Sequence, residues 1–352
     1  MGTVLNKSDY ICVVPFKYTE VFDNKQFLCC PGWLKEDIYE TDNLLENFNS
    51  IKAQNIRKSI LDGSYKYCDS IQCPHLSNLE NNKLNTDTLI PKNQVNLKDY
   101  PLVSSIRRLN MCFDRSCNLK CPSCRLDFIN YLGSDRISVE DKLEQINNQL
   151  GKDLRYLYLS GSADPFYSKS FRQFLINFDS SKFPFLKRIH IHTNGLLWTE
   201  AMWSKMHKVH KYVNTCEISI DAATKETYET KTRLGGDWDT LIENLNFIIK
   251  IPTISKYIFS FVVQDNNYKE MYKFWEICSN LNKEANKNIT VFFNRITNWG
   301  TYSDEEYVIK NISSDSHPLH QDFLTHFNKI KNLPNVLHNL GEVDLNIDRT
   351  LI

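Results

Sequence analysis

Residues 106–124 have the sequence IRRLNMCFDRSCNLKCPSC, and the rest of the chain can be organised around them. The first part, residues 106–112, is biased towards apolar side chains and predicts a strand. A loop with three thiols at C-x3-C-x2-C spacing follows, at Cys117, Cys121 and Cys124. We therefore expect a strand that delivers three cysteines to the loop at its carboxyl end.

The remainder of the chain alternates strand and helix patterns. Further strand patterns lie at 154–160, 187–192, 214–220, 257–264 and 289–295. Helical patterns lie between them, at 139–150, 169–178, 199–209, 238–250 and 267–282. Strand and helix that alternate in this way predict right-handed βαβ units, a parallel sheet and therefore the α/β class. Parallel barrels carry their sites on the loops at the carboxyl ends of the strands.

Composition excludes several classes of function. The chain has 352 residues, which suggests one large domain and a smaller one. Its 42 basic and 42 acidic residues balance, and no long run of one sign argues for nucleic acid or an anionic membrane surface. No apolar stretch approaches the roughly 20 residues that span a bilayer, and the start lacks the pattern of a signal peptide. We expect a cytoplasmic protein.

The eleven cysteines are many for a cytoplasmic protein, and their odd number and uneven clustering disfavour a disulfide framework. Metal ligation explains them better. An early group comprises Cys12, Cys29, Cys30, Cys68 and Cys73, and a second comprises Cys112, Cys117, Cys121 and Cys124. Cys216 and Cys278 stand alone, and we expect them to be core thiols.

The spacing C-x3-C-x2-C favours an iron–sulfur cluster. A [4Fe–4S] cluster held by cysteine alone normally takes four thiolates, so three leave one iron open. An open coordination position distinguishes a catalytic metal site from a closed structural one. Zinc is the alternative, with Cys112 as a fourth ligand. Cys112 lies in the predicted strand, where a thiol is more often a buried apolar group than a ligand.

The three-cysteine loop resembles that of the radical S-adenosylmethionine superfamily. The resemblance implies a partial (β/α)6 parallel barrel over residues 102–300 and a [4Fe–4S] cluster on Cys117, Cys121 and Cys124. The open iron would chelate the amino and carboxylate groups of S-adenosylmethionine. The implied reaction is reductive cleavage of that cofactor to a 5′-deoxyadenosyl radical, which abstracts hydrogen from the substrate, with an electron donor such as flavodoxin or ferredoxin.

Other strand ends carry motifs similar to those of the same superfamily. The turn Ser160-Gly161-Ser162-Ala163-Asp164-Pro165 resembles its Gly-Gly-Glu-Pro turn, although a plain βα turn is the alternative. Thr-Asn-Gly at 193–195 and Ser-Ile-Asp at 219–221 match its ribose-binding motifs, and Arg233 matches its cofactor-carboxylate arginine, with a solvated arginine as the alternative. The resemblance thus assigns cofactor contacts to Ser160, Gly161, Asp164, Asn194, Ser219, Arg233 and Gln264.

Residues 1–75 form a second predicted unit. A hairpin at 22–27 and a helix at 51–62 bury little apolar area by themselves, so a bound metal or cluster would supply stability. This unit resembles the SPASM/twitch type of auxiliary domain, which implies a second [4Fe–4S] cluster, with zinc as the alternative. The implied ligands are Cys12, Cys30, Cys68 and Cys73. Cys30 is preferred to Cys29 because two adjacent thiols rarely reach the same cluster.

The remaining segments complete the expected organisation. Residues 76–101 are polar and lie between Pro74 and Pro101, which predicts a linker. Residues 301–352 are expected to cap the barrel. The predicted function is a radical S-adenosylmethionine enzyme that oxidises or otherwise modifies a peptide or a small polar metabolite. A non-catalytic iron–sulfur or zinc scaffold is the alternative, whereas a methyltransferase that uses the same cofactor without a radical would need no cluster.

Overall fold

The computed structural model describes residues 5–34, 36–80, 84–95, 105–159 and 161–341. Its centre is a nine-stranded sheet with the order β11-β10-β9-β8-β7-β6-β5-β2-β3. All neighbouring strands run parallel except the β2–β3 hairpin. The α/β class with a parallel sheet is therefore confirmed.

The strands of this sheet are β2 Tyr18–Phe22, β3 Lys25–Phe27, β5 Arg108–Cys112, β6 Tyr156–Leu159, β7 Arg188–Thr193, β8 Val213–Ser219, β9 Lys256–Val263, β10 Asn288–Arg295 and β11 Val336–His338. The α-helices are α1 Leu44–Phe48, α2 Ile51–Leu61, α3 Pro74–Glu80, α4 Gly133–Gln145, α5 Lys169–Ile176, α6 Glu200–Lys205, α7 Lys225–Thr227, α8 Trp238–Ile248, α9 Met271–Ala285, α10 Asp304–Lys310 and α11 His320–Ile330. The six strand patterns of the sequence correspond to β5 through β10. None of the helices in the described residues has the length and hydropathy that crossing a bilayer requires.

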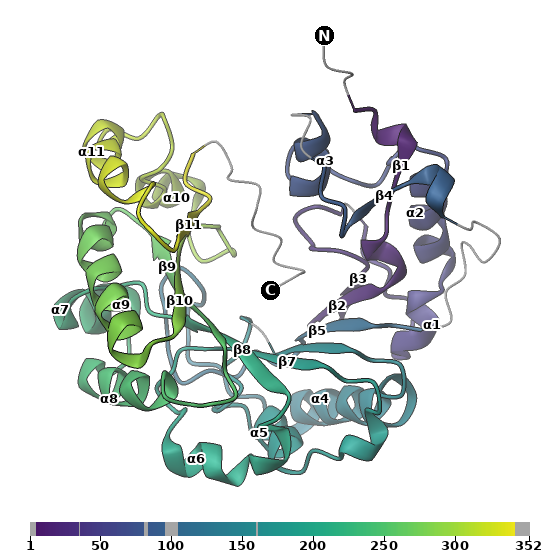
Figure 1. The fold of residues 1–352 in the computed structure, drawn as a ribbon, viewed down its shortest axis with the longest axis horizontal. Helices are drawn as coiled ribbons and strands as arrows, with labels where there is room; N and C mark the ends of the chain where they lie inside the picture. The colour runs from purple at the N-terminus through teal and green to yellow at the C-terminus, as the bar shows by residue number, and fades with distance from the viewer. Residues whose placement is uncertain (1–4, 35, 81–83, 96–104, 160, 342–352) are drawn as a thin grey trace.

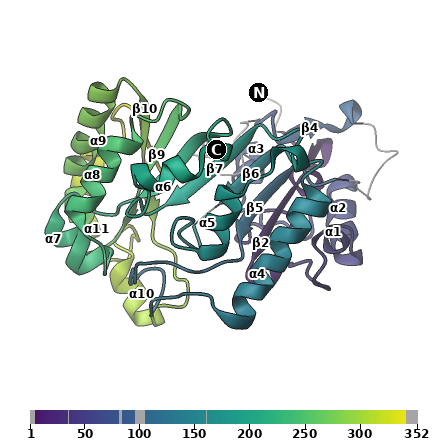
Figure 2. The same cartoon turned by 90° about the horizontal axis from the view of Figure 1, so that it is seen from below.

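The two faces of the sheet differ in chemistry because side chains alternate along each strand. One face is apolar and buried, with Leu109, Met111, Leu157 and Leu159 all fully covered. Figures 1 and 2 show α4, α5, α6, α8 and α9 around this side of the sheet. The opposite side, called the inner face below, carries Arg108, Asn110, Tyr156, Tyr158, His190, His192, Thr215, Glu217, Ser219 and Ser260.

The amino-terminal segment is joined to the same sheet. The predicted hairpin is present, with Phe22 opposite Lys25. Its strand β2 pairs in parallel with β5, and β1 (Tyr10–Cys12) pairs with β4 (Leu89–Pro91) in a separate two-stranded sheet. Figure 1 shows α1, α2 and α3 beside these strands.

A buried arginine holds α2 in place. Arg57 is fully buried and donates to the carbonyl oxygens of Pro15 at 2.9 Å and Phe48 at 2.7 Å. Its guanidinium also lies 4.4 Å from the centre of the Phe48 ring. Burial lowers the pKa of Arg57 to about 10. A charge placed there requires these carbonyl partners, so Arg57 fixes the helix against the loops that precede it.

The predicted linker and the predicted capping segment both contain helices and strands. In the segment 76–101, the described residues include part of α3 and all of β4, while 81–83 and 96–101 lie outside the description. Beyond residue 301 come α10, α11 and β11, and β11 extends the sheet by pairing in parallel with β10. Residues 342–352 of the predicted cap also lie outside the description.

Candidate functional site

The three thiols of the C-x3-C-x2-C loop follow the carboxyl end of β5, and each meets a nitrogen donor. Cys117 and Cys121 are buried, whereas Cys124 is partly exposed. The donor–sulfur pairs are Asn194 Nδ2 to Cys117 at 3.8 Å, Arg233 Nη1 to Cys121 at 3.5 Å and Arg125 Nη2 to Cys124 at 3.4 Å. Arg125 belongs to the thiol loop itself, whereas Asn194 and Arg233 come from elsewhere in the chain, so the fold brings two further loops to the thiols. N–H donors and guanidinium groups stabilise the negative charge that thiolate ligands carry.

Arg125 connects the thiol loop to the turn after β6. It is 5% exposed and donates to the carbonyl oxygens of Arg115 at 2.8 Å and Ser162 at 2.9 Å, besides its contact with Cys124. Ser162 Oγ in turn donates to the carbonyl oxygen of Cys112 at 2.8 Å. The sequence analysis did not single out Arg125. The available signal was a cation directly after the third cysteine.

Asp164 lies at the same turn and is saturated with protein donors. Its Oδ2 accepts from Thr193 Oγ1 at 2.6 Å and from the Asn194 N–H at 2.9 Å. Its Oδ1 accepts from the N–H groups of Phe166 at 3.0 Å and Tyr167 at 3.1 Å. Asp164 is 1% exposed, so in this arrangement it connects the end of β6 to the end of β7. It thereby positions Asn194, whose amide also donates to Asn118 Oδ1 at 2.9 Å.

Arg233 is held by a buried ion pair. Its Nη2 lies 2.7 Å from Asp221 Oδ2, and its Nε donates to the Ile220 carbonyl oxygen at 3.4 Å. Burial raises the pKa of Asp221 and opposes charge on Arg233, yet Asp221 and the Cys121 thiol together raise the pKa of Arg233. We take the pair as ionised because a guanidinium keeps its charge in proteins. Asp221 itself adopts a left-handed backbone, with φ of 62°.

The remaining predicted cofactor residues lie at other strand ends. Ser160 is outside the described residues. At Gly161 an added Cβ would lie 3.2 Å from the His192 ring, so a larger residue would crowd that histidine. Ser219 Oγ lies 2.7 Å from His192 Nε2 and 3.1 Å from Ser260 Oγ, in a polar chain on the inner face. Gln264 is 2% exposed and follows β9.

The early cysteines come together in the amino-terminal segment. Burial raises the pKa of the Cys29 thiol, and the charges of Cys73, Cys12, Cys30 and Cys68 raise it further. These thiols therefore lie within electrostatic reach of Cys29. The sequence favours Cys30 as the ligand, whereas the structure buries Cys29 and leaves Cys30 partly exposed. No sequence signal separates the two adjacent residues, and only their placement in the fold distinguishes them.

The residues around the C-x3-C-x2-C loop fit a thiolate-bound cluster in the chemistry of their donor set. Burial raises the pKa of Cys117 to about 12, and Arg125 opposes that shift. The thiolate form therefore depends on a bound cation. In the described part of the chain, no group of three or more His, Cys, Asp or Glu side chains is arranged to hold a metal ion, so the fit rests on the donors around the thiols and not on the spacing of the sulfur atoms.

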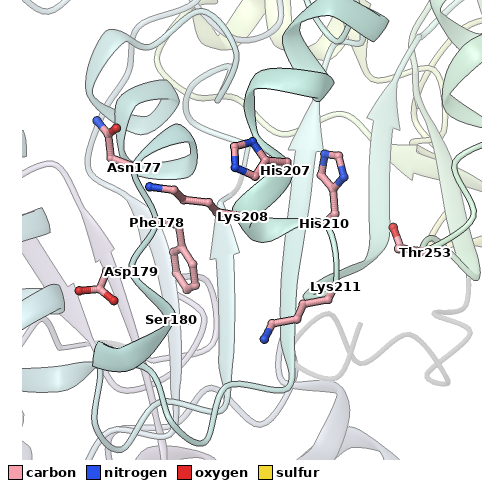
Figure 3. A pocket seen from close by; sticks show the side chains of 9 residues that line it. All are labelled: Asn177, Phe178, Asp179, Ser180, His207, Lys208, His210, Lys211 and Thr253. Atoms are coloured by element: carbon pink, nitrogen blue, oxygen red, sulfur yellow. The ribbon is translucent and has the colours of Figure 1, made fainter.

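A separate cavity lies at the opposite, amino end of the strands. It has a volume of about 890 Å³ and opens between the segments that precede β7, β8 and β9 (Figure 3). It is lined by Asn177, Phe178, Asp179, Ser180, His207, Lys208, His210, Lys211 and Thr253. None of the predicted site residues lines it, so this cavity is distinct from the thiol loop.

No family model and no curated protein matches this chain. Among solved structures, Streptococcus suis SuiB bound to the precursor peptide SuiA is 15% identical, with a TM-score of 0.44 over 94% of this chain and 71% of that one. Native anSMEcpe with bound AdoMet is 17% identical, with a TM-score of 0.40 over 62% of this chain and 61% of that one. TYW1 with a lysine-pyruvate adduct bound is 13% identical, with a TM-score of 0.35 over 64% of this chain and 70% of that one. These likenesses are distant.

Proposed function

We propose that this chain is a radical S-adenosylmethionine enzyme whose catalytic [4Fe–4S] cluster is bound by Cys117, Cys121 and Cys124. The observation that carries the proposal is the meeting of three thiols at C-x3-C-x2-C spacing with three nitrogen donors beyond the carboxyl ends of parallel strands. Loops in that position are where parallel α/β folds place their sites. Three thiolates leave one iron of such a cluster open to a cofactor.

When bound, the reduced cluster supplies an electron that cleaves S-adenosylmethionine to methionine and a 5′-deoxyadenosyl radical, which abstracts hydrogen from a substrate. The protein positions and shields these groups. Arg125 and Arg233 place positive charge beside Cys124 and Cys121, and Asn194 contacts Cys117. The burial of two of the three thiols excludes water from that side of the site.

The cofactor contacts proposed from the resemblance are Ser160, Gly161, Asp164, Asn194, Ser219, Arg233 and Gln264. Two of these residues carry a positioning role in addition. Asp164 orients Asn194 through its backbone N–H, and Arg233 is itself oriented by Asp221. Strands β5 through β10 would form the partial (β/α)6 barrel of residues 102–300, followed by the capping segment 301–352.

The direct test is anaerobic reconstitution with iron and sulfide, reduction with dithionite, and chromatography for 5′-deoxyadenosine after S-adenosylmethionine is added. We expect the product from the natural protein and its loss in Cys117→Ala, Cys121→Ala and Cys124→Ala variants. Cys278→Ala is the matched control, because Cys278 is a buried thiol on α9 and should not affect the product. Full iron loading and reduction without 5′-deoxyadenosine would instead favour a non-catalytic iron–sulfur scaffold.

We further propose a second [4Fe–4S] cluster in an auxiliary domain over residues 1–75, with 76–101 as the linker. Cys12, Cys68 and Cys73 would ligate it together with one member of the Cys29–Cys30 pair. Such a fully ligated cluster would accept an electron from the substrate radical, which makes the net reaction an oxidation. Variants at Cys68 and Cys73 that fold, keep the catalytic cluster and still turn over normally would contradict this role.

Single substitutions can show which of Cys29 and Cys30 binds the proposed second cluster. The chain gives Cys29 a buried position among the other thiols, whereas Cys30 is partly exposed. We therefore expect Cys29→Ser to lose about four irons per chain, the content of one cluster, and Cys30→Ser to lose fewer. Iron and sulfide analysis of the two variants measures this directly. The reverse result would restore Cys30 as the ligand.

The proposed substrate is a peptide or a small polar metabolite, and the proposed electron donor is a flavodoxin or ferredoxin in the cytoplasm. The inner face supports a polar substrate, because it carries hydroxyl, imidazole and carboxylate groups beside the proposed site. His192 Nε2, for example, lies 2.7 Å from Ser219 Oγ and 3.7 Å from Glu217 Oε1. An apolar substrate would displace solvent from these groups without offering them hydrogen bonds.

A further inference from the structure

The cavity at the amino end of the strands has a lining with more cationic than acidic side chains. Its lining comes mainly from two segments that precede β7 and β8, residues 177–180 and 207–211. The second segment supplies Lys208, Lys211 and two imidazoles, whereas Asp179 is the only acid among the described residues that line the cavity. Figure 3 shows both lysine side chains extending from the second segment towards the first.

Neither lysine has a counter-charge in the described part of the chain. No carboxylate there lies within ion-pair distance of Lys208 or Lys211. Asp179 Oδ1 accepts from the Ser181 N–H at 3.0 Å and from Ser181 Oγ at 2.7 Å, and so caps the 3₁₀-helix that follows. These hydrogen bonds lower the pKa of Asp179, with further contributions from the charges of Lys182 and Lys208. An anion in the cavity would therefore meet two ammonium groups that make no ion pair within the described structure.

Two imidazoles lie beside the lysines, and one of them is held in place. His207 and His210 are three residues apart across a 3₁₀ turn, which places their side chains on the same side. The His210 ring stacks on Trp203, with ring centres 4.1 Å apart, and its Nε2 donates to the Trp203 carbonyl oxygen at 2.8 Å. Because a carbonyl oxygen can only accept, Nδ1 is the nitrogen that remains for a ligand. It can accept from a phosphate hydroxyl or, when the ring is protonated, donate to a phosphate oxygen.

The cavity also has an apolar wall. Phe178 lines it and is buried for the most part, with 4% of its surface exposed. Its ring stacks on Phe183, with ring centres 4.9 Å apart, and meets Tyr212 at 5.5 Å in an edge-to-face contact. Because these contacts fix the ring, an apolar part of a ligand can pack against it without the cost of ordering a side chain.

The size of the cavity favours an organic anion over a single inorganic one. Its volume of about 890 Å³ is that of a pocket for a small organic ligand, for which about 300–1,000 Å³ is typical, and one phosphate would fill only a small part of it. Asn177, Ser180 and Thr253 line the same cavity and bring amide and hydroxyl groups that can donate to phosphate oxygens. The lining thus combines cations, neutral donors and an apolar wall.

We infer that this cavity binds a small organic phosphate, with its phosphate group on Lys208 and Lys211 and its aromatic or other apolar portion against Phe178. The inference goes beyond the proposed function and does not depend on it, because the described lining contains none of the cysteines or cofactor residues proposed above. Ligand binding at this cavity and 5′-deoxyadenosine formation can therefore fail independently.

The test is titration calorimetry of the full chain with four probes: phenyl phosphate, phenol, benzoate and inorganic phosphate. We expect phenyl phosphate to bind more tightly than the other three, with an affinity that falls as salt is added. The double variant Lys208→Gln, Lys211→Gln should weaken phenyl phosphate binding about tenfold or more, because two charge-assisted contacts are lost. Both lysines are exposed, so the variant should keep the melting temperature of the natural protein.

The matched control is Lys205→Gln, Lys250→Gln, which removes the same charge at exposed positions outside the lining. It should bind phenyl phosphate like the natural protein. An equal loss in the control would show nonspecific attraction and overturn the inference. Phenol, benzoate or inorganic phosphate binding as tightly as phenyl phosphate would overturn it as well, and so would the absence of measurable binding at millimolar phenyl phosphate.

Discussion

The two ends of the same parallel sheet differ in whether their buried charges have partners of opposite sign. Beyond the carboxyl ends, Arg233 meets Asp221 at 2.7 Å, and Asp164 accepts four hydrogen bonds from the protein. At the amino ends, Arg188 and Lys256 have no acidic partner in the described residues. Positive charge is thus paired near the thiols, whereas these two cations of the far end have no carboxylate partner in the described part of the chain.

This difference indicates which buried charges the protein neutralises and which it leaves without a counter-charge. Paired groups near the thiols hold loops from several strands in fixed positions, as a catalytic site requires. A partly buried cation without a counter-charge makes no ion pair that the fold depends on, so its removal should cost little stability. The comparison therefore predicts different costs when equivalent charges are removed from the two ends.

The largest effect is expected for Arg233→Met. Its removal leaves the Asp221 carboxylate buried without a counter-charge, which should lower the free energy of unfolding by about 3–5 kcal/mol. Urea unfolding measures this. Arg115→Met is the control, because Arg115 is half-exposed and lies 3.7 Å from Asp23, where an ion pair contributes about 0–1 kcal/mol. Similar costs for the two variants would contradict the contrast between paired and solvated charge.

Asp164→Ala should be the next most costly change. It leaves the donors at Thr193, Asn194, Phe166 and Tyr167 without their acceptor, so we expect a loss of about 2–4 kcal/mol. Asp164→Asn keeps one oxygen and should lose less. If the alanine variant unfolds at the same urea concentration as the natural protein, the carboxylate does not connect β6 to β7 as described.

The sequence predicted the sheet well and the paired contacts poorly, for a physical reason. Each of β5 through β10 has a local apolar pattern, so all six strands were found from residues that are neighbours in the chain. The pairing of β2 with β5 and of β11 with β10 joins distant segments and leaves no local signal.

The same limit applies to the candidate site. The spacing of Cys117, Cys121 and Cys124 is local and was found directly. The contacts of Arg125 with Ser162 and of Asp164 with Asn194 depend on how separate loops meet. Asp164 and Asn194 could be proposed from the sequence, whereas these contacts and the role of Arg125 could not. The position of Cys29 among the other early thiols likewise depends on how separate segments of the chain meet.

The stability of the protein should depend on pH through His190, in the middle of the inner face. Burial lowers the pKa of His190 to about 3, while Glu217 raises it and His192, Arg188 and Lys256 lower it. In the unfolded chain this histidine has an ordinary pKa of about 6.5, so it binds a proton at a higher pH than in the folded protein. Its contribution to the free energy of unfolding is therefore fully present above about pH 6.5 and is lost as pH falls towards 3. Between pH 7 and pH 5 the free energy of unfolding should fall by about 2 kcal/mol. His190→Gln should remove that portion of the pH dependence, whereas His207→Gln, at an exposed site, should not.

The smallest effect is expected at the amino end of the sheet, for Arg188→Met. The substitution loses the contact of the guanidinium with the Tyr156 ring, worth about 0.5–1 kcal/mol, but it also relieves repulsion on Lys256 and removes the unpartnered buried Nε. These terms oppose one another, so the free energy of unfolding should change by no more than about 1 kcal/mol, against several for Arg233→Met. Urea unfolding of both variants in one low-salt buffer gives the comparison. A cost at Arg188 as large as that at Arg233 would mean that the contacts of Arg188 stabilise the fold as much as the Arg233–Asp221 ion pair, and the contrast between the two ends of the sheet would then be wrong.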